Sequence, residues 1–149
     1  MIYLGADHRG YRAKEALKPF LQKRSIAFED LGAHEYNPDD DYPDFAFAVA
    51  KKVAEHPEVD KGILLCGSGM GMDVAANKVK GARATVAYSK DSALHARSND
   101  NINVITMAAD HLSLKEITDI TMSFLETTFS GEERHVRRLE KIKNIESEN

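Results

Sequence analysis

The chain has 149 residues, of which 42% are hydrophobic and 30% charged, and its 24 acidic and 20 basic residues give a formal net charge of −4. This composition is typical of a globular protein, here one domain over residues 1–149, and the acidic balance argues against a nucleic-acid-binding surface. A single cysteine allows no internal disulfide, and the sequence has no long uncharged apolar run that could span a membrane. The first ten residues resemble a strand more than a signal peptide. We therefore expect a cytoplasmic protein.

Short apolar runs alternate with amphipathic segments along the whole chain. The pattern predicts strands at residues 1–6, 26–32, 61–67, 82–89 and 103–109 and helices at residues 11–24, 45–56, 72–79, 91–98, 113–129 and 132–146. A polar, acidic loop is expected at residues 33–44, and Ser113 with Glu116 forms a capping box for the fifth helix.

This alternation of strands and helices indicates βα units. The predicted fold is a three-layer α/β/α Rossmann-like fold with a five-stranded parallel sheet and an extra C-terminal helix. We expect the first strand at the centre, with the second and third strands beside it. Ligands of such sheets bind beyond the carboxyl ends of the strands, and four segments follow those ends. They are residues 7–8, 66–71, 89–91 and 108–111.

The segment CGSGMG, residues 66–71, places the only cysteine before three alternating glycines. Its spacing fits neither the dinucleotide fingerprint nor the P-loop. A cysteine-phosphatase loop would need an arginine where Met72 stands. Two interpretations remain open. Cys66 is a base or nucleophile above an oxyanion-binding turn, or it is a buried residue that ends a core strand. If the next helix starts near Met70, its first N–H groups favour an anion above Cys66.

Other polar residues extend this picture. Asp7 and His8 end the first strand and suit the binding of a sugar hydroxyl or a phosphate. Tyr42 lies in an acidic stretch that is most simply a solvated loop, although its hydroxyl or ring could reach a ligand. Arg134 and Arg138 share one helix face, so both could grip a phosphate.

Two further features limit the chemistry. His95 is better explained as a packed or surface helix residue than as a catalyst. The spacing of His, Cys, Asp and Glu matches no metal-ligand pattern, so we infer no metal. A phosphate-binding end together with a thiol at a glycine turn suggests a small phosphorylated metabolite as the ligand.

The motifs LGADHRGY, DYPDFA, CGSGMGMDVAANKVKGARA, NVI and RHVRRLEKI occur in this order over nearly the whole chain. In this combination the sequence resembles the ribose-5-phosphate isomerase B family, which also includes galactose-6-phosphate isomerase subunits. The resemblance implies aldose–ketose isomerisation of a sugar phosphate through an enediolate, without a cofactor. It also implies a homodimer or tetramer with active sites at the subunit interface.

The resemblance also implies roles for matching residues. Cys66 would be the base that moves a proton between C1 and C2, and Ser68 would handle a hydroxyl proton. N–H groups of the glycine turn would stabilise the enediolate, and Asp7 and Tyr42 would contact sugar oxygens. His8, Arg134 and Arg138 would hold the phosphate, and the two arginines could come from a neighbouring subunit. The implied substrate-binding residues are Asp7, His8, Tyr42, Gly67, Gly69, Met70, Gly71, Asn99, Asp100, Arg134 and Arg138.

Three positions depart from the family pattern. Asn99 stands where a ring-opening histidine is expected, Asp100 where an asparagine is expected, and Asp110 where an arginine often binds phosphate. All three are expected in the part of the site completed by a second subunit, where Asp110 would repel a phosphate.

These departures leave several alternatives open. Ring opening could be spontaneous or assisted by His111, His135 or Asp100. The substrate could be another aldose phosphate, such as allose or galactose 6-phosphate or a tetrose phosphate. The chain could also be a non-catalytic sugar-phosphate binding protein, or a subunit that depends on a partner.

Overall fold

The computed structural model describes residues 1–148, and its five strands form one parallel sheet. The strands are β1 (Ile2–Ala6), β2 (Phe28–Asp30), β3 (Lys61–Cys66), β4 (Ala84–Val86) and β5 (Val104–Ala108). Their order across the sheet is β2-β1-β3-β5-β4. The helices are α1 (Tyr11–Lys23), α2 (Tyr42–Glu55), α3 (Met70–Ala76), α4 (Lys90–Asp100), α5 (Leu114–Glu126) and α6 (Glu133–Glu148).

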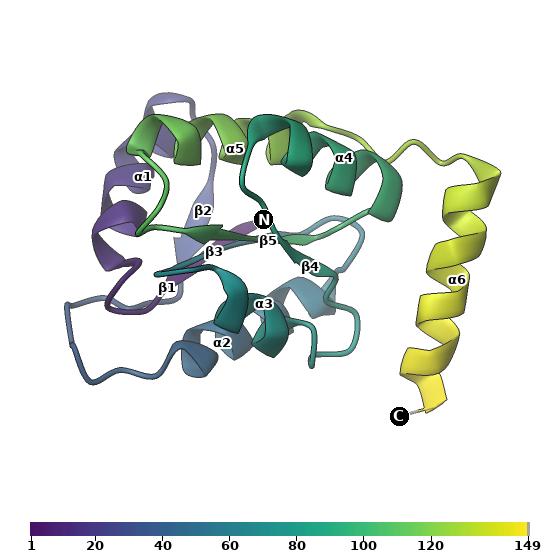
Figure 1. Cartoon of the computed structure of the whole chain (residues 1–149), viewed down its shortest axis with the longest axis horizontal. Coiled ribbons are helices and arrows are strands. Elements are labelled where there is room, and N and C mark those ends of the chain that lie inside the picture. Colours follow the sequence, from purple (N-terminus) through teal and green to yellow (C-terminus); the bar gives the residue numbers. More distant parts are fainter. Residues whose placement is uncertain (149) are drawn as a thin grey trace.

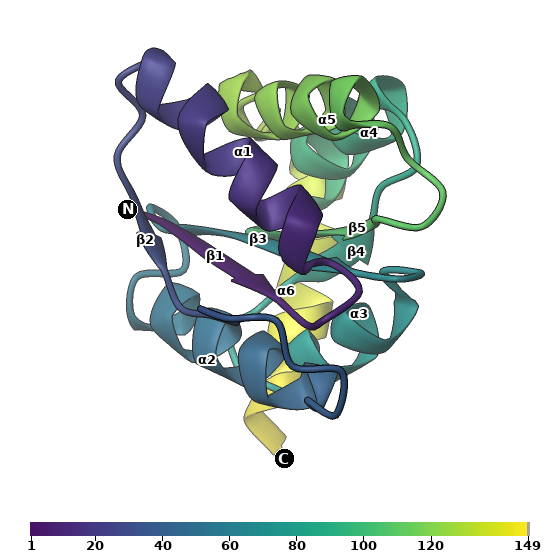
Figure 2. The same ribbon diagram turned by 90° about the vertical axis from the view of Figure 1, so that its left-hand side faces the viewer.

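Helices cover both faces of the sheet. Figures 1 and 2 show α1, α4 and α5 on one face and α2 and α3 on the other. The predicted three-layer α/β/α fold with a five-stranded parallel sheet is therefore confirmed, and so is the extra C-terminal helix. None of the helices in residues 1–148 combines the length and the apolar character needed to cross a bilayer.

The predicted strand order is only partly correct. β1 does lie between β2 and β3, but the middle strand is β3. β5 separates β3 from β4 because the five-residue β5 is almost wholly buried, whereas the three-residue β4 is half-buried and suits an edge.

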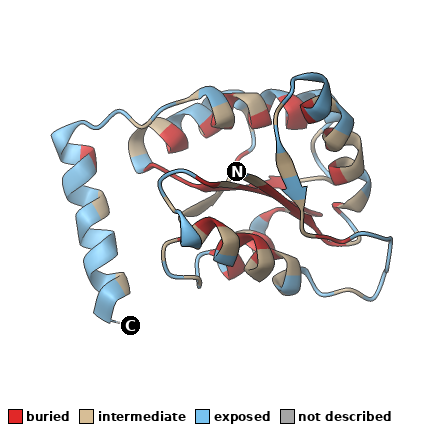
Figure 3. Cartoon of the chain, turned by 180° about the vertical axis from the view of Figure 1, so that it is seen from behind, coloured by how far each residue is buried: buried red, intermediate tan, exposed pale blue. Residues whose placement is uncertain are grey.

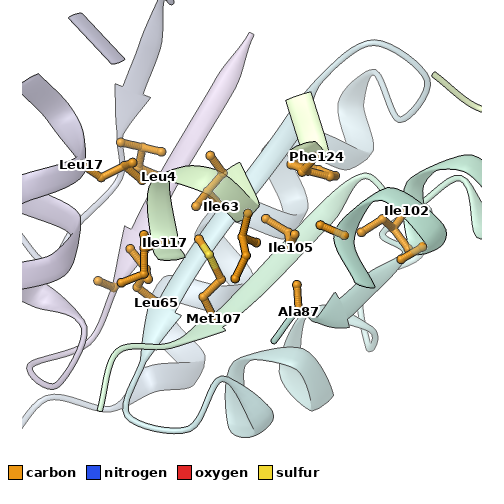
Figure 4. Close-up of a cluster of buried hydrophobic side chains, with 14 of the residues drawn as sticks. Leu4, Leu17, Ile63, Leu65, Ala87, Ile102, Ile105, Met107, Ile117 and Phe124 are labelled. Atoms are coloured by element: carbon orange, nitrogen blue, oxygen red, sulfur yellow. The ribbon is translucent and has the colours of Figure 1, made fainter. Parts of the chain in front are cut away.

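Each face of the sheet has its own apolar core. Leu4, Ile63, Leu65, Ile105 and Met107 pack against α1, α4 and α5, as Figure 4 shows for the labelled side chains. On the other face, α2 and α3 cover a second cluster that includes Cys66. β3 contributes to both clusters, which is typical of a strand buried on both faces of a parallel sheet.

Several element boundaries differ from the prediction. α2 begins at Tyr42, inside the segment expected to be a loop, because a proline such as Pro43 is well accommodated in the first turn of a helix. α3 begins at Met70, two residues earlier than the periodicity indicates. The capping box of Ser113 and Glu116 is confirmed, with each side chain bonded to the backbone N–H of the other residue.

A buried ion cluster joins α1 to β2. Lys14 is fully buried, and its Nζ atom lies 2.5 Å from an oxygen of Asp30. Lys18 donates to the same oxygen at 2.9 Å. Burial alone would raise the pKa of Asp30, but the hydrogen bonds from the two lysines outweigh it, so the pKa lies below its usual range.

Candidate functional site

The turn between β3 and α3 holds the cysteine in a polar niche. Cys66 is the last residue of β3 and only 5% exposed. The backbone N–H of Gly69 donates to its Sγ atom at 3.1 Å. Gly69 has φ +78°, a conformation that glycine adopts without steric cost and that starts α3. This N–H group is a fixed donor to the sulfur atom, and the first N–H groups of α3 have no acceptor within their own helix.

The turn after β1 packs directly on the end of β3. Asp7 is buried, and its Oδ1 atom accepts hydrogen bonds from the N–H groups of Arg9 and Gly10, each at 2.9 Å. A Cβ on Gly10 would lie 2.0 Å from the carbonyl oxygen of Leu65, so only glycine allows this approach. Burial raises the pKa of Asp7 above its usual value. The Asp7-His8 segment is therefore fixed beside the cysteine turn.

His8 has a carboxylate partner that sequence reasoning missed. Asp40 Oδ1 lies 2.6 Å from His8 Nδ1 and also accepts the backbone N–H of His8 at 3.0 Å. Asp40 is 32 residues away along the chain, in the acidic loop whose composition alone indicates a solvated segment. Its side chain is only 8% exposed.

Asp7, His8 and Asp40 also form a group of three potential metal ligands, whose ligand atoms lie within 4.8 Å of one another. Sequence spacing did not reveal this group. In the structure, the Nδ1 atom of His8 and the Oδ1 atom of Asp40 are engaged with each other in a hydrogen bond.

Tyr42 joins the site from the start of α2. Its ring lies against Gly71, where an added Cβ would lie 2.8 Å from the ring carbon Cζ. The side chain is partly exposed, so the ring forms a wall beside the turn that follows Cys66. The acidic loop therefore positions both Asp40 and Tyr42.

An ion pair of Arg9 and Asp110 lies over the same turn. A Cβ on Gly67 would meet the Arg9 guanidinium at 2.5 Å and the Asp110 carboxylate at 2.9 Å. Asp110 was expected in the part of the site supplied by a second subunit, and that expectation is wrong. It follows β5 and stands beside the Cys66 turn of its own chain. Its charge is balanced by Arg9, a residue that no sequence motif singled out.

The remaining predicted residues do not meet this group within one chain. Asn99 and Asp100 lie in the last turn of α4, and Arg134 and Arg138 lie on α6. α6 is attached at the amino-terminal edge of the sheet, where Glu146 accepts the N–H of Gly81 at 2.9 Å. Figures 1 and 3 show α6 standing apart from the layers and exposed along most of its length.

The predicted residues thus form two groups. The Cys66 group, at the carboxyl ends of the strands, consists of Asp7, His8, Tyr42 and residues 66–71. The α4–α6 group, at the opposite edge, consists of Asn99, Asp100, Arg134 and Arg138. The six-residue β3 alone spans about 17 Å between these edges.

The histidines near the second group differ in accessibility. His135 is 4% exposed and its Nδ1 atom lies 2.8 Å from the Ser130 hydroxyl, so it cannot serve as a ring-opening group without a rearrangement. His95 is exposed, and the side-chain amide of Asn99 lies 3.3 Å from its Nδ1 atom.

The fold has a parallel sheet between two layers of helices, and β3 ends in a thiol and a glycine turn beside an Asp-His pair. This arrangement is the one expected for an isomerase of the ribose-5-phosphate isomerase B type. Residues 2–142 match the Ribose/Galactose Isomerase family. The chain belongs to this family.

Individual relatives agree over nearly their full length. The probable ribose-5-phosphate isomerase B of Mycoplasma genitalium is 40% identical over 147 residues, which cover 99% of this chain and 96% of the relative. Ribose-5-phosphate isomerase B of Mycobacterium tuberculosis H37Rv is 38% identical over 145 residues, covering 97% and 89%.

Solved structures show the same fold. The M. genitalium ribose-5-phosphate isomerase B with bound ribulose 5-phosphate superposes with a TM-score of 0.96 at 40% identity, covering 99% of this chain and 97% of that one. The Clostridium thermocellum ribose-5-phosphate isomerase B gives a TM-score of 0.92 at 38% identity, covering 99% and 97%.

Proposed function

We propose that the chain interconverts ribose 5-phosphate and ribulose 5-phosphate through an enediolate, without a cofactor. The observation that carries this proposal is the Cys66 thiol, held by a backbone N–H at the mouth of the glycine turn and flanked by the Asp7-His8 segment. The names of the relatives and the ribulose 5-phosphate bound to the M. genitalium enzyme support this choice of substrate. The single cysteine suits a reducing compartment, and we place the reaction in the cytoplasm.

The reaction needs one carbon-bound proton to move. In the open-chain aldose, the Cys66 thiolate takes the proton from C2, and the C–H electron pair forms the C1–C2 double bond while O1 gains the negative charge. N–H groups of the turn stabilise this oxygen. Ser68 passes the O2 hydroxyl proton to O1, and the Cys66 thiol returns its proton to C1, which gives the ketose. Met72, fully buried and without a titratable group, cannot be the base.

A complete site on this proposal needs a second copy of the chain. The two groups of predicted residues lie at opposite edges of the sheet, so the α4–α6 group of one copy would complete the Cys66 group of the other. Exposed apolar side chains beside the edge strand β4 support this association. Met70 is 66% exposed and Tyr88 76%, and Val74 and Leu94 are also exposed. Arg134 and Arg138 would then hold the phosphate of a substrate bound to the other subunit.

The direct test is an isomerisation assay of the purified protein with ribose 5-phosphate and a panel of other aldose phosphates, with Cys66→Ala in parallel. We expect ribose 5-phosphate to be the preferred substrate and Cys66→Ala to lose about a thousandfold in kcat, the range of a general base. Turnover of a different aldose phosphate alone would replace the substrate, and no turnover of any by the intact protein would overturn the proposal.

A further inference from the structure

We propose that Asp40 is a positioning residue for His8. Its carboxylate holds the imidazole with a proton on Nδ1 and thereby leaves Nε2 for the phosphorylated end of the substrate. This inference rests on the proposed function for the identity of the substrate, but the hydrogen bond and its consequence for the imidazole do not.

Asp40 fixes the orientation of the His8 imidazole ring through its Nδ1 side. A single carboxylate oxygen, Asp40 Oδ1, lies 2.6 Å from Nδ1 and 3.0 Å from the backbone nitrogen of His8. A carboxylate only accepts hydrogen bonds, so Nδ1 must carry the proton. Nε2 forms no hydrogen bond with any group of residues 1–148, and the side chain keeps 27% of its surface exposed. The free nitrogen is therefore available to a ligand, and its orientation is set by Asp40.

Asp40 is buried, so its contact with His8 is not an incidental contact between surface side chains. The side chain is 8% exposed, and its second oxygen, Oδ2, is buried and has no hydrogen-bond partner within residues 1–148. A buried acceptor without a donor lowers stability, and a charged one more so. If Asp40 served only to close the loop, a neutral side chain at this position would make the folded protein more stable. A functional requirement explains why a carboxylate stands here.

The surroundings contain few competing groups. Asp7 faces His8 from the end of β1, and its Oδ1 atom is already used by two backbone N–H groups. His34 and Glu35 line a cavity of about 400 Å³ that Asp40 also lines. Both are exposed, and neither forms a hydrogen bond or an ion pair with the His8 ring. Asp40 is therefore the group that determines the state of Nδ1.

The chain offers a matched control. Asp39 has the same charge and lies next to Asp40 in the same loop, but its side chain is exposed and has no ion pair within residues 1–148. Asp40→Asn preserves the size of the side chain, removes its charge and introduces an NH₂ donor, so the group that faces Nδ1 is no longer restricted to accepting. Asp39→Asn removes an equal charge at the neighbouring position. The conservative variant Asp40→Glu keeps a carboxylate in the loop.

The first readout is the ¹⁵N shifts of the His8 ring nitrogens in labelled protein, assigned with His8→Asn. We expect wild type and Asp39→Asn to carry the proton on Nδ1, and Asp40→Asn to change the distribution between the nitrogens. Identical shifts in wild type and Asp40→Asn would overturn the inference. This readout requires no turnover, so it stands even if the intact protein isomerises no sugar.

The second readout separates a positioning role from a structural one. With Asp40→Asn we expect KM for ribose 5-phosphate and the inhibition constant for inorganic phosphate to rise about ten- to a hundredfold, the loss of one charge-assisted hydrogen bond, with a smaller change in kcat. The melting temperature should be unchanged or higher, and Asp40→Glu should recover part of the affinity. A lower melting temperature with unchanged KM and unchanged phosphate inhibition would show that Asp40 only closes the loop.

Discussion

Two inactive variants of this chain should restore activity to each other when their subunits exchange. One variant is Cys66→Ala, and the other combines Arg134→Ala with Arg138→Ala. In the proposed dimer, each site uses the cysteine of one subunit and the arginines of its partner. A mixed dimer then contains one site with both defects and one site with neither. The opposite positions of the two groups along the sheet are the basis of this expectation.

The size of the effect follows from counting dimers. Random exchange of equal amounts makes half of the dimers mixed, and each mixed dimer has one intact site of two, so the mixture should regain about a quarter of wild-type activity. The assay is turnover of ribose 5-phosphate before and after exchange, with native mass spectrometry to measure mixed dimers. Arg137→Ala, an exposed residue on the same helix, is the control and should be active alone. Verified mixed dimers without recovered activity would refute the shared site.

Two further predictions concern stability. Gly10→Ala places a Cβ 2.0 Å from the carbonyl oxygen of Leu65, a backbone atom that cannot move aside, so urea denaturation should show a loss of about 3 kcal/mol. A loss below about 0.5 kcal/mol, the size of an ordinary surface substitution, would contradict this packing. Asp30→Asn should cost about 3 kcal/mol at pH 7, because it leaves the buried charge of Lys14 without its closest partner. Burial raises the pKa of Asp30, but the hydrogen bonds from Lys14 and Lys18 lower it further, so the net shift is downward. This stabilisation is therefore present above the ordinary aspartate pKa and is lost as the pH falls through the lowered value. A difference between wild type and variant that stays constant throughout acid titration would contradict it.

The fold was predictable because local patterns determine most of it. Alternating apolar runs and amphipathic segments indicated each βα unit, and Ser113 and Glu116 marked a helix start through a contact three residues apart. Tyr42 was misplaced in a loop because an acidic, proline-containing stretch looks like a turn, although Pro43 is compatible with the first turn of a helix. Strand order depended on which apolar strand the edge strand β4 would pair with, and no local signal encodes that choice.

The site could be predicted only where its functional residues are neighbours in the sequence or directly follow a strand. Cys66 and its glycines are adjacent in sequence, and Asp7-His8 follows a strand. The partners of these residues come from distant segments. Asp40 is 32 residues from His8, and Asp110 is 101 residues from Arg9. The charge of Asp110 looked unfavourable in the sequence because the partner that neutralises it could not be identified without the fold.

In the proposed reaction, Cys66 moves the carbon-bound proton of a sugar phosphate. The most direct measurement is turnover of ribose 5-phosphate in D₂O, followed by NMR at C1 and C2, for wild type and Cys66→Ala. We predict that wild type forms ribulose 5-phosphate and introduces deuterium at the carbons that exchange their proton through Cys66. Cys66→Ala, folded and still able to bind phosphate, should lose both activities by about a thousandfold. Turnover and deuterium uptake at undiminished rates in Cys66→Ala would contradict the account.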